Sequence, residues 1–202
     1  MTRKPRTIAF WQGRLPHWEV EDGRYFITIH LRGAIPAAGR ERLRSIVDSL
    51  AKLADNHGPD WLQLQRAIFR EMEHWLDQAR WAPHFGKREV AEMVVEAVEH
   101  RARRREWDVF EFVVMPTHIH LFCEVSDRGL KGTLEDFKRW TGHRAVALLP
   151  EFDADRFWQR EWFDHWSRSD EEDERIVAYI RNNPVKAGLV TSWAEYPYRL
   201  RK

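Results

Sequence analysis

The sequence predicts an α+β fold in which a central antiparallel sheet is flanked by helices. Residues 25–36 form a strand-like run rich in aromatic and β-branched side chains. Residues 106–125 form two strand-like runs separated by a short interruption, which favours antiparallel pairing. Helical periodicity covers much of the remaining chain, and it alternates irregularly with the strands. This combination is typical of an α+β protein.

Size and composition indicate one globular domain. The chain has 202 residues, of which 43% are hydrophobic and 32% are charged. We therefore expect a single domain over residues 1–202, with a helical insertion at about 38–104 after the first predicted strand. The first twenty residues lack the apolar core of a signal peptide, and no apolar run is long enough to span a membrane. The single cysteine, Cys123, excludes an internal disulfide, and we expect a cytoplasmic protein.

Each element of the first half follows from its pattern. Gly33 and Pro36 close the strand at 25–36. Residues 37–56 then change to a helical period. One face of this helix carries Leu43, Ile46, Val47, Leu50 and Leu53. Residues 60–79 and 87–104 give two further helices.

The second half begins with the strand at 106–116, which Pro116 and Thr117 separate from the strand at 118–125. Residues 133–149 are expected to be helical, whereas the aromatic-rich stretch 155–168 has no clear period.

The last predicted helix has the best-defined start. Ser169 and Glu172 have the spacing of a capping box, and acidic residues fill the first turn, where the helix dipole favours them. The helix is expected to stop near Pro184, because a proline disfavours helical geometry at the preceding residue, Asn183.

Two histidines in the strand at 118–125 are candidate metal ligands. His118 and His120 project from one face of the strand with Phe122 and Glu124, since side chains alternate. Their positions lie about 6.5–7 Å apart along a strand, which allows both rings to reach one divalent cation. The same spacing also suits two packed or hydrogen-bonded histidines, and spacing alone leaves both interpretations open.

Tyr179 and Asn183 are candidates on the last helix. Residues four apart share a helix face, so the Asn183 amide oxygen is a candidate third ligand of a His/His/Asn site. Such a site would leave open positions for a phosphate, and it suits Mg²⁺ or Mn²⁺, with imidazole favouring Mn²⁺. The alternative is that Tyr179 packs as an ordinary aromatic residue beside Ile176 and Ile180.

Four stretches together resemble a known family. In chain order they are "VVMPTHIHLFCEV", "FWQREWFDHWSRSDEE", "YIRNNPVKAGLV" and "YPYR". They resemble the landmarks of single-tyrosine HUH transposases of the IS200-like superfamily, and most of all the REP-associated tyrosine transposase branch. "YFITIHLRGAIP" is similar to the first strand of that group, whereas residues 37–100 are less diagnostic.

The resemblance implies a ferredoxin-like HUH sheet and a DNA-cleaving activity. It implies that His118 and His120 bind a divalent metal, Mg²⁺ or Mn²⁺, that Asn183 assists the metal, and that Tyr179 is the nucleophile. Such transposases cleave and rejoin single-stranded DNA near hairpin palindromes through a 5′-phosphotyrosine intermediate. The expected partner is single-stranded or hairpin DNA and not a membrane. We expect a nucleoid-associated monomer or homodimer.

Cationic clusters supply candidates for DNA binding. The net charge is only +1, so the distribution of charge matters more than its sum. We predict phosphate contacts by Lys138, Arg139, Arg103, Arg104 and Arg105, which cluster near the predicted hairpin and the helix after it. Trp140 is a candidate for base stacking. Solvated helix faces are the alternative explanation for such clusters, and the core is the expected place of most tryptophans.

Two other functions compete with the transposase hypothesis. A nucleotide hydrolase of the histidine-triad kind needs a third histidine at position 122, where this chain has Phe122. The stronger rival is a domesticated relative that binds hairpin DNA without cleaving it. Thr117 stands where relatives commonly have Asn or a similar polar residue, which is a minor departure.

Overall fold

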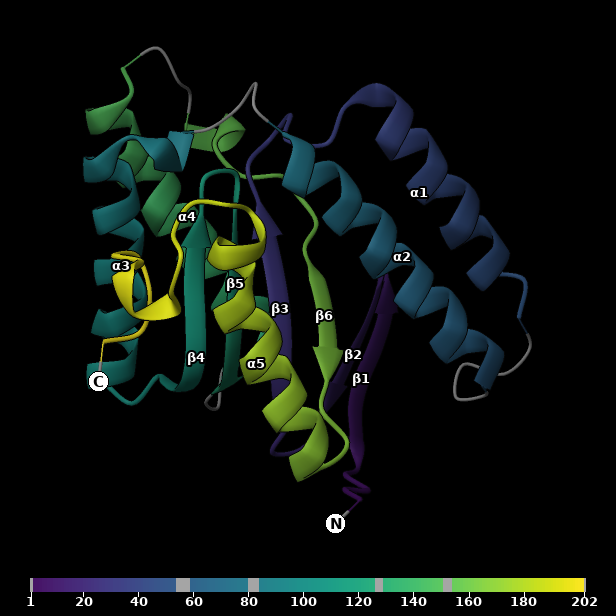
Figure 1. Ribbon diagram of the computed structural model, residues 1–202. Helices are drawn as coiled ribbons and strands as arrows, with labels where there is room; N and C mark the ends of the chain where they lie inside the picture. Colours follow the sequence, from purple (N-terminus) through teal and green to yellow (C-terminus); the bar gives the residue numbers. More distant parts are fainter. Residues whose placement is uncertain (1, 54–58, 80–83, 126–128, 151–153, 202) are drawn as a thin grey trace.

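A four-stranded antiparallel sheet forms the centre of the protein (Figure 1). The computed structural model describes residues 2–53, 59–79, 84–125, 129–150 and 154–201. The strands lie in the order β4-β5-β3-β6. Their bounds are β3 Arg24–His30, β4 Trp107–Met115, β5 His118–Val125 and β6 Phe163–Trp166. The predicted fold class and the predicted 106–125 hairpin are confirmed, and β5, which carries both histidines, is an inner strand.

The sequence prediction missed a β-hairpin that precedes this sheet. Strands β1 (Thr7–Gln12) and β2 (Pro16–Val20) pair antiparallel as a separate two-stranded sheet. The Trp18 ring packs edge-on against Trp61 and Trp166, and its indole nitrogen donates to Thr7 Oγ1 at 3.0 Å. The strand predicted at 25–36 is therefore the third strand of the chain, and it ends at His30 because a turn at Gly33, with φ +84°, follows.

Three helices lie between β3 and β4, as predicted. They are α1 (Ala37–Leu50), α2 (Pro59–Gln78) and α3 (Arg88–Arg103). Helices α1 and α2 lie side by side on one flank of the molecule, whereas α3 lies on the other (Figure 1). The last residues of the helix predicted at 37–56, residues 54–56, lie outside the described part of the chain. The division into one domain with an insertion at about 38–104 stays a prediction.

Helices α4 (Gly129–Leu148) and α5 (Asp170–Lys186) cover opposite faces of the sheet. On the face of Ile119, Trp107 of β4 contacts Phe137 of α4, with ring centroids 5.2 Å apart. On the other face, His120 contacts Tyr179 of α5, with centroids 5.5 Å apart. The helix predicted at 133–149 is confirmed, although it begins four residues earlier, at Gly129.

Helix α5 does not stop near Pro184 as expected. It continues to Lys186 with the proline inside it. Pro184 cannot donate a backbone hydrogen bond, but it is buried beside Ile180 in the helix–sheet interface. The carbonyls of Asn183 and Pro184 accept from the amides of Ala187 and Leu189, both at 2.9 Å. The predicted start is confirmed, because Ser169 Oγ accepts from the Glu172 amide at 3.2 Å.

Short elements complete the described chain. Three 3₁₀ helices lie at η1 (His84–Gly86), η2 (Ala154–Arg156) and η3 (Trp193–Glu195). The aromatic-rich stretch at 155–168, which had no predicted structure, includes strand β6. Among the described helices, none has the length and apolarity needed to cross a membrane.

Candidate active site

Three side chains that can ligate a metal meet on one face of the sheet. Glu73 of α2 and His118 and His120 of β5 place their ligand atoms within 4.8 Å of one another. The two Nε2 atoms are 3.1 Å apart, and Glu73 Oε2 lies 3.3 Å from His120 Nε2. The residues are only 6%, 1% and 0% exposed, respectively. Two imidazoles and one carboxylate therefore converge on a single desolvated point.

Hydroxyl groups orient both imidazole rings. Thr117 Oγ1 lies 3.0 Å from His118 Nδ1, and Thr28 Oγ1 lies 2.9 Å from His120 Nδ1. The Thr117 hydroxyl donates to the Leu76 carbonyl at 3.4 Å, so its oxygen accepts from the His118 Nδ1–H. This assignment leaves His118 Nε2 unprotonated, as in metal sites where a second group fixes the tautomer, and its lone pair faces His120 Nε2 at 3.1 Å. The Thr117 hydroxyl thus holds the His118 ring in one orientation.

Burial sets the protonation state of the cluster. Burial and the neighbouring His120 lower the pKa of His118 to about 3, so its ring is neutral at ordinary pH. Burial alone would raise the pKa of Glu73, but the imidazoles of His120 and His118 lower it to about 2. Neutral imidazole and ionised carboxylate are the forms that ligate metals.

Tyr179 reaches the same point from α5. Its hydroxyl donates a hydrogen bond to Glu73 Oε2. Its ring lies 5.7 Å from Phe26, 5.5 Å from Phe69 and 5.5 Å from His120, measured between centroids. Burial and the Glu73 carboxylate raise the pKa of the phenol above its ordinary value. The tyrosine and both histidines meet within one chain.

Asn183 lies one helical turn after Tyr179 and is 2% exposed. Its Nδ2 donates to the Tyr179 carbonyl at 3.4 Å. Among the described residues, neither its buried Oδ1 nor the buried Oε1 of Glu73 has a hydrogen-bond partner. Unpaired buried oxygens are costly. The Glu73 oxygen belongs to the cluster, and Asn183 shares a helix face with Tyr179. An oxygen-binding divalent cation such as Mg²⁺ or Mn²⁺ fits this donor set of two imidazoles and two side-chain oxygens.

Two ion pairs fix α5 in place. Arg181 Nε lies 2.6 Å from Glu111 Oε2 of β4, and the Glu111 side chain is 2% exposed. Lys186 Nζ lies 2.7 Å from Asp77 Oδ2 of α2. One pair holds α5 to the sheet and the other holds it to the helix that carries Glu73. Together they fix the tyrosine relative to both parts of the cluster.

A cavity of about 200 Å³ opens beside Tyr179, between α2 and α5. Phe26, Phe69 and Phe163 form its apolar wall, and the exposed Arg66 and Arg175 also line it. Guanidinium groups at such an opening suit a phosphate.

Sequence reasoning missed Glu73. The residue lies on α2 between Met72 and Leu76, which are 1% and 3% exposed. An acidic residue beside the buried stripe of an amphipathic helix was the available signal, but it is weak. The contact joins segments 45 residues apart (Glu73 and His118), and no periodicity reports it.

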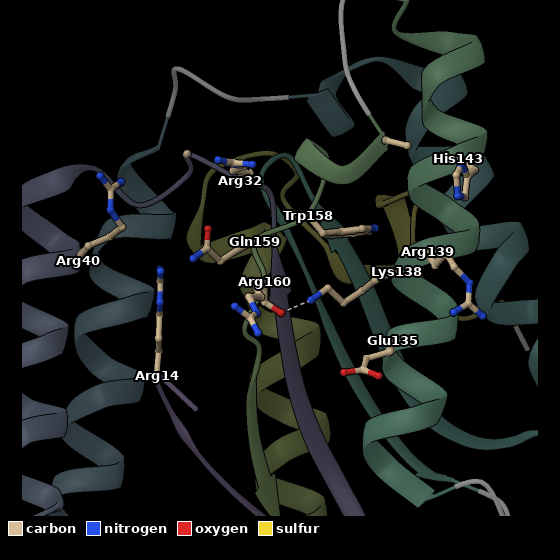
Figure 2. Close-up of a pocket in the computed structure, with 12 residues that line it drawn as sticks. Arg14, Arg32, Arg40, Glu135, Lys138, Arg139, His143, Trp158, Gln159 and Arg160 are labelled. Atoms are coloured by element: carbon tan, nitrogen blue, oxygen red, sulfur yellow. Dashed lines mark hydrogen bonds between the residues drawn. The ribbon is translucent and has the colours of Figure 1, made fainter. Parts of the chain in front are cut away.

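The structure does not bring the predicted DNA-binding residues to one place. Lys138 and Arg139 lie on α4 and line a cleft, and Figure 2 shows Lys138 extending into it. Arg103 ends α3, Arg104 and Arg105 follow it, and none of the three lines that cleft. Arg103 and Arg104 pair with Glu99 and Glu106 at 3.6 Å and 2.9 Å. Trp140 is 40% exposed and lies near the guanidinium groups of Arg101 and Arg144.

Comparisons with known proteins agree with this geometry. The model of the family described as "Transposase IS200 like" matches residues 78–183, which include both histidines, Tyr179 and Asn183. Helix α1 and most of α2, including Glu73, precede the matched range. Among solved structures, the chain has a fold similar to that titled "Structure of the REP associates tyrosine transposase bound to a REP hairpin". The TM-score is 0.58 at 17% identity, over 93% of this chain and 82% of the other. No curated protein matches the chain.

Proposed function

The chain belongs to the IS200-like transposase family, and we propose that it cleaves and rejoins single-stranded DNA through a 5′-phosphotyrosine intermediate on Tyr179. One observation carries the proposal: the Tyr179 hydroxyl, the Glu73 carboxylate and the Nε2 atoms of both histidines meet at one buried point. A phenol that only packed in the core would not need a metal-ligand cluster at its oxygen.

His118, His120 and Glu73 are the proposed metal ligands, with the Asn183 oxygen as a fourth donor. A bound Mg²⁺ or Mn²⁺ would withdraw charge from a non-bridging oxygen of the scissile phosphate. The threonine hydroxyls hold the two rings so that they need not reorganise when the ligand arrives.

The proposed chemical step balances as a transesterification. The Tyr179 oxygen attacks phosphorus, the bond from phosphorus to the 3′-oxygen breaks, and the 5′-phosphate becomes bonded to tyrosine. Glu73 accepts the hydrogen bond of the phenol and so orients its oxygen, and the phenolic proton passes to water. A proton from water completes the leaving 3′-hydroxyl. The reverse attack by a 3′-hydroxyl rejoins the strand, because the covalent intermediate keeps a phosphodiester bond.

Hairpin DNA is the proposed substrate class. The structural neighbour is described as bound to a REP hairpin. We propose that this chain acts near comparable imperfect palindromes, as its "MPTHIH" and "YIRNNPVKAGLV" motifs also suggest. The alternative is a domesticated protein that binds such hairpins without cleaving them.

Formation of a covalent adduct separates these two functions. Purified protein is incubated with Mn²⁺ and a single-stranded oligonucleotide that contains a hairpin from its own genomic surroundings. The proposal predicts a protein–DNA band that survives SDS, and predicts that Tyr179→Phe removes it. Tyr198→Phe is the matched control, because Tyr198 contacts Tyr196 away from the cluster.

Each outcome bears on the proposal. An adduct that Tyr179→Phe retains would assign the nucleophile to another residue. Hairpin binding without any wild-type adduct, across the flanking palindromes, would support the non-cleaving alternative and reject strand transfer.

A further inference from the structure

A cationic cleft of about 710 Å³ lies on the α4 side of the molecule, away from Tyr179. Figure 2 shows its walls, with α4 on one side and Arg14 and Arg40 on the other. Arg14 comes from the turn of the β1–β2 hairpin and Arg40 from α1. Six cationic side chains line the cleft: Arg14, Arg32, Arg40, Lys138, Arg139 and Arg160. They come from five separate segments, so the fold has gathered them.

The positive charge of this cleft is only partly compensated, and of its arginines Arg139 pairs with a carboxylate, that of Asp136, at 2.7 Å. Glu135 is the one acidic residue among those that line it in the described chain. Within the same part of the chain, the exposed guanidinium groups of Arg14, Arg32 and Arg160 form no ion pair or hydrogen bond. Arg103 and Arg104 at the end of α3, by contrast, have carboxylate partners. Concave, uncompensated positive charge attracts polyanions.

Lys138 adds a cation that is already positioned. Its ammonium group donates to the Arg160 carbonyl and lies 5.2 Å from the centroid of the Trp162 ring. These contacts hold the side chain across the floor of the cleft, as Figure 2 shows. A fixed cation loses less side-chain entropy when it binds a phosphate than a freely moving one does.

The cleft continues towards the buried cluster. A second cavity of about 490 Å³ shares Arg14, Arg40 and Gln159 with the cleft and reaches His30 and Met72. His30 pairs in register with His118 and, by alternation from Thr28, faces the same side of the sheet as the histidine pair. Met72 directly precedes Glu73. The two cavities thus extend from the α4 side, around the end of β3, to His30 and Met72, which adjoin His118 in the sheet and Glu73 in the helix.

We propose that this cleft binds the phosphate backbone of a single-stranded DNA segment and directs it towards the cluster. The inference rests on the proposed function for the reaction, but the binding surface is a separate prediction. An unpaired strand is the form of DNA that can follow a cavity bounded by His30 and Met72. Proteins that bind single strands use positively charged grooves of this kind. The family model matches only residues 78–183, so it does not cover Arg14, Arg32 and Arg40 of the cleft.

The test compares two triple variants with the same change in charge. Arg14→Gln/Arg32→Gln/Arg160→Gln removes the unpaired cations of the cleft. Arg103→Gln/Arg104→Gln/Arg105→Gln removes three cations from the end of α3. Binding of a fluorescent single-stranded oligonucleotide is measured by anisotropy, without added metal, between about 50 and 200 mM salt.

The cleft variant is expected to bind the oligonucleotide about tenfold more weakly than wild type. The plot of log affinity against log salt concentration should also become less steep by about 2, because each of three lost phosphate contacts contributes ~0.7 to the slope. The control variant should stay within about twofold of wild type, contrary to the expectation from clustering in the sequence. Arg103 and Arg104 already pair with Glu99 and Glu106, and none of the three changed residues lines either cavity. Equal losses in both variants, or no loss in the cleft variant, would overturn the proposal. A blunt duplex that competes as well as the single strand would also reject the single-stranded assignment.

Failure of this inference and failure of the proposed function are distinguishable. All changed residues of the cleft are exposed, and circular dichroism with a thermal melt checks that the variant folds. If wild type forms the covalent adduct but the cleft variant binds DNA normally, the cleft proposal fails and the reaction stands. If binding depends on the cleft but no adduct forms, the cleft stands and the proposed reaction fails.

Discussion

Two buried clusters in this protein combine histidine with carboxylate, and they behave in opposite ways. In one, His17 of β2 contacts Asp164 of β6 through Nδ1 and lies 3.3 Å from Glu161 Oε2 through Nε2. In the other, His118 and His120 meet Glu73. His17 and His118 are each 1% exposed, so burial does not distinguish them.

The partners of the ring nitrogens decide the charge. Burial alone would lower the pKa of His17, but the two carboxylates raise it to about 9, and the ring is an imidazolium at neutral pH. The ring nitrogens of His118 face a hydroxyl and a second imidazole, so nothing there offsets burial, which together with His120 lowers its pKa to about 3. A protonated histidine cannot ligate a metal, whereas a neutral one can. The comparison assigns a structural role to His17 and leaves the neutral His118 available for chemistry.

The surroundings of His17 agree with a structural role. Its ring stacks on Trp11 at 5.1 Å and lies 4.8 Å from Trp162, measured between centroids. The Trp162 indole donates to the same Asp164 carboxylate at 2.9 Å. The ion pair therefore joins the β1–β2 hairpin to the edge strand of the main sheet, and it offers no free lone pair to a ligand.

The largest expected effect tests the assignment of the histidine pair. His118→Ala/His120→Ala should lose Mn²⁺ binding by calorimetry and reduce adduct formation on the order of a thousandfold, because a catalytic metal contributes several kcal/mol. The exposed pair His74→Ala/His100→Ala serves as the control. An adduct at the wild-type level in the first variant would assign the chemistry to other residues.

The next effect concerns the stability that His17 provides. Its pKa of about 9 when folded lies above the value of about 6.5 when unfolded, so its contribution is complete below about pH 6.5 and is lost as the pH rises through about 9. This loss amounts to about 3 kcal/mol of unfolding free energy, at ~1.4 kcal/mol per pH unit of difference.

Urea denaturation at acidic and alkaline pH measures that loss. His17→Gln should remove most of the difference between wild type at the two pH values. If wild type and His17→Gln lose the same unfolding free energy between acidic and alkaline pH, His17 is not the group responsible. The contrast between the two clusters then fails.

Glu73→Gln sharpens the comparison from the carboxylate side. The variant keeps the shape of the side chain but loses its charge, and we expect Mn²⁺ affinity to fall on the order of 100-fold. Glu71→Gln is the matched control on the same helix, because Glu71 bonds to Trp75 and not to the cluster. Tighter metal binding by Glu73→Gln would show that the carboxylate blocks the site instead of completing it.

The smallest expected effect concerns the hydroxyls that orient the rings. Thr28→Val and Thr117→Val should each weaken Mn²⁺ binding by about tenfold, the lower end of the range for such supporting groups. Thr133→Val is the control, because the buried Thr133 hydroxyl has no hydrogen-bond partner among the described residues. Unchanged affinity in both threonine variants would mean that packing alone holds the imidazoles.

Long periodic segments were predictable and short or irregular ones were not. Helices α1, α2 and α3 and the β4–β5 hairpin follow from patterns of eight residues or more in the chain itself. The β1–β2 hairpin and the four-residue strand β6 were missed, because their pairing depends on aromatic contacts with distant segments. The helix end near Pro184 was wrong because burial of the proline offsets its missing donor.

The sequence by itself determined which residues share a face. Alternation placed His118 and His120 together, and the helical repeat placed Tyr179 above Asn183. Only the tertiary structure brought Glu73 to these residues and separated Lys138 from Arg103. The physical reason is that backbone geometry fixes the direction of neighbouring side chains within an element. Contacts between elements depend on how their buried faces pack, and the hydrophobic periodicity of a single sequence does not specify that packing.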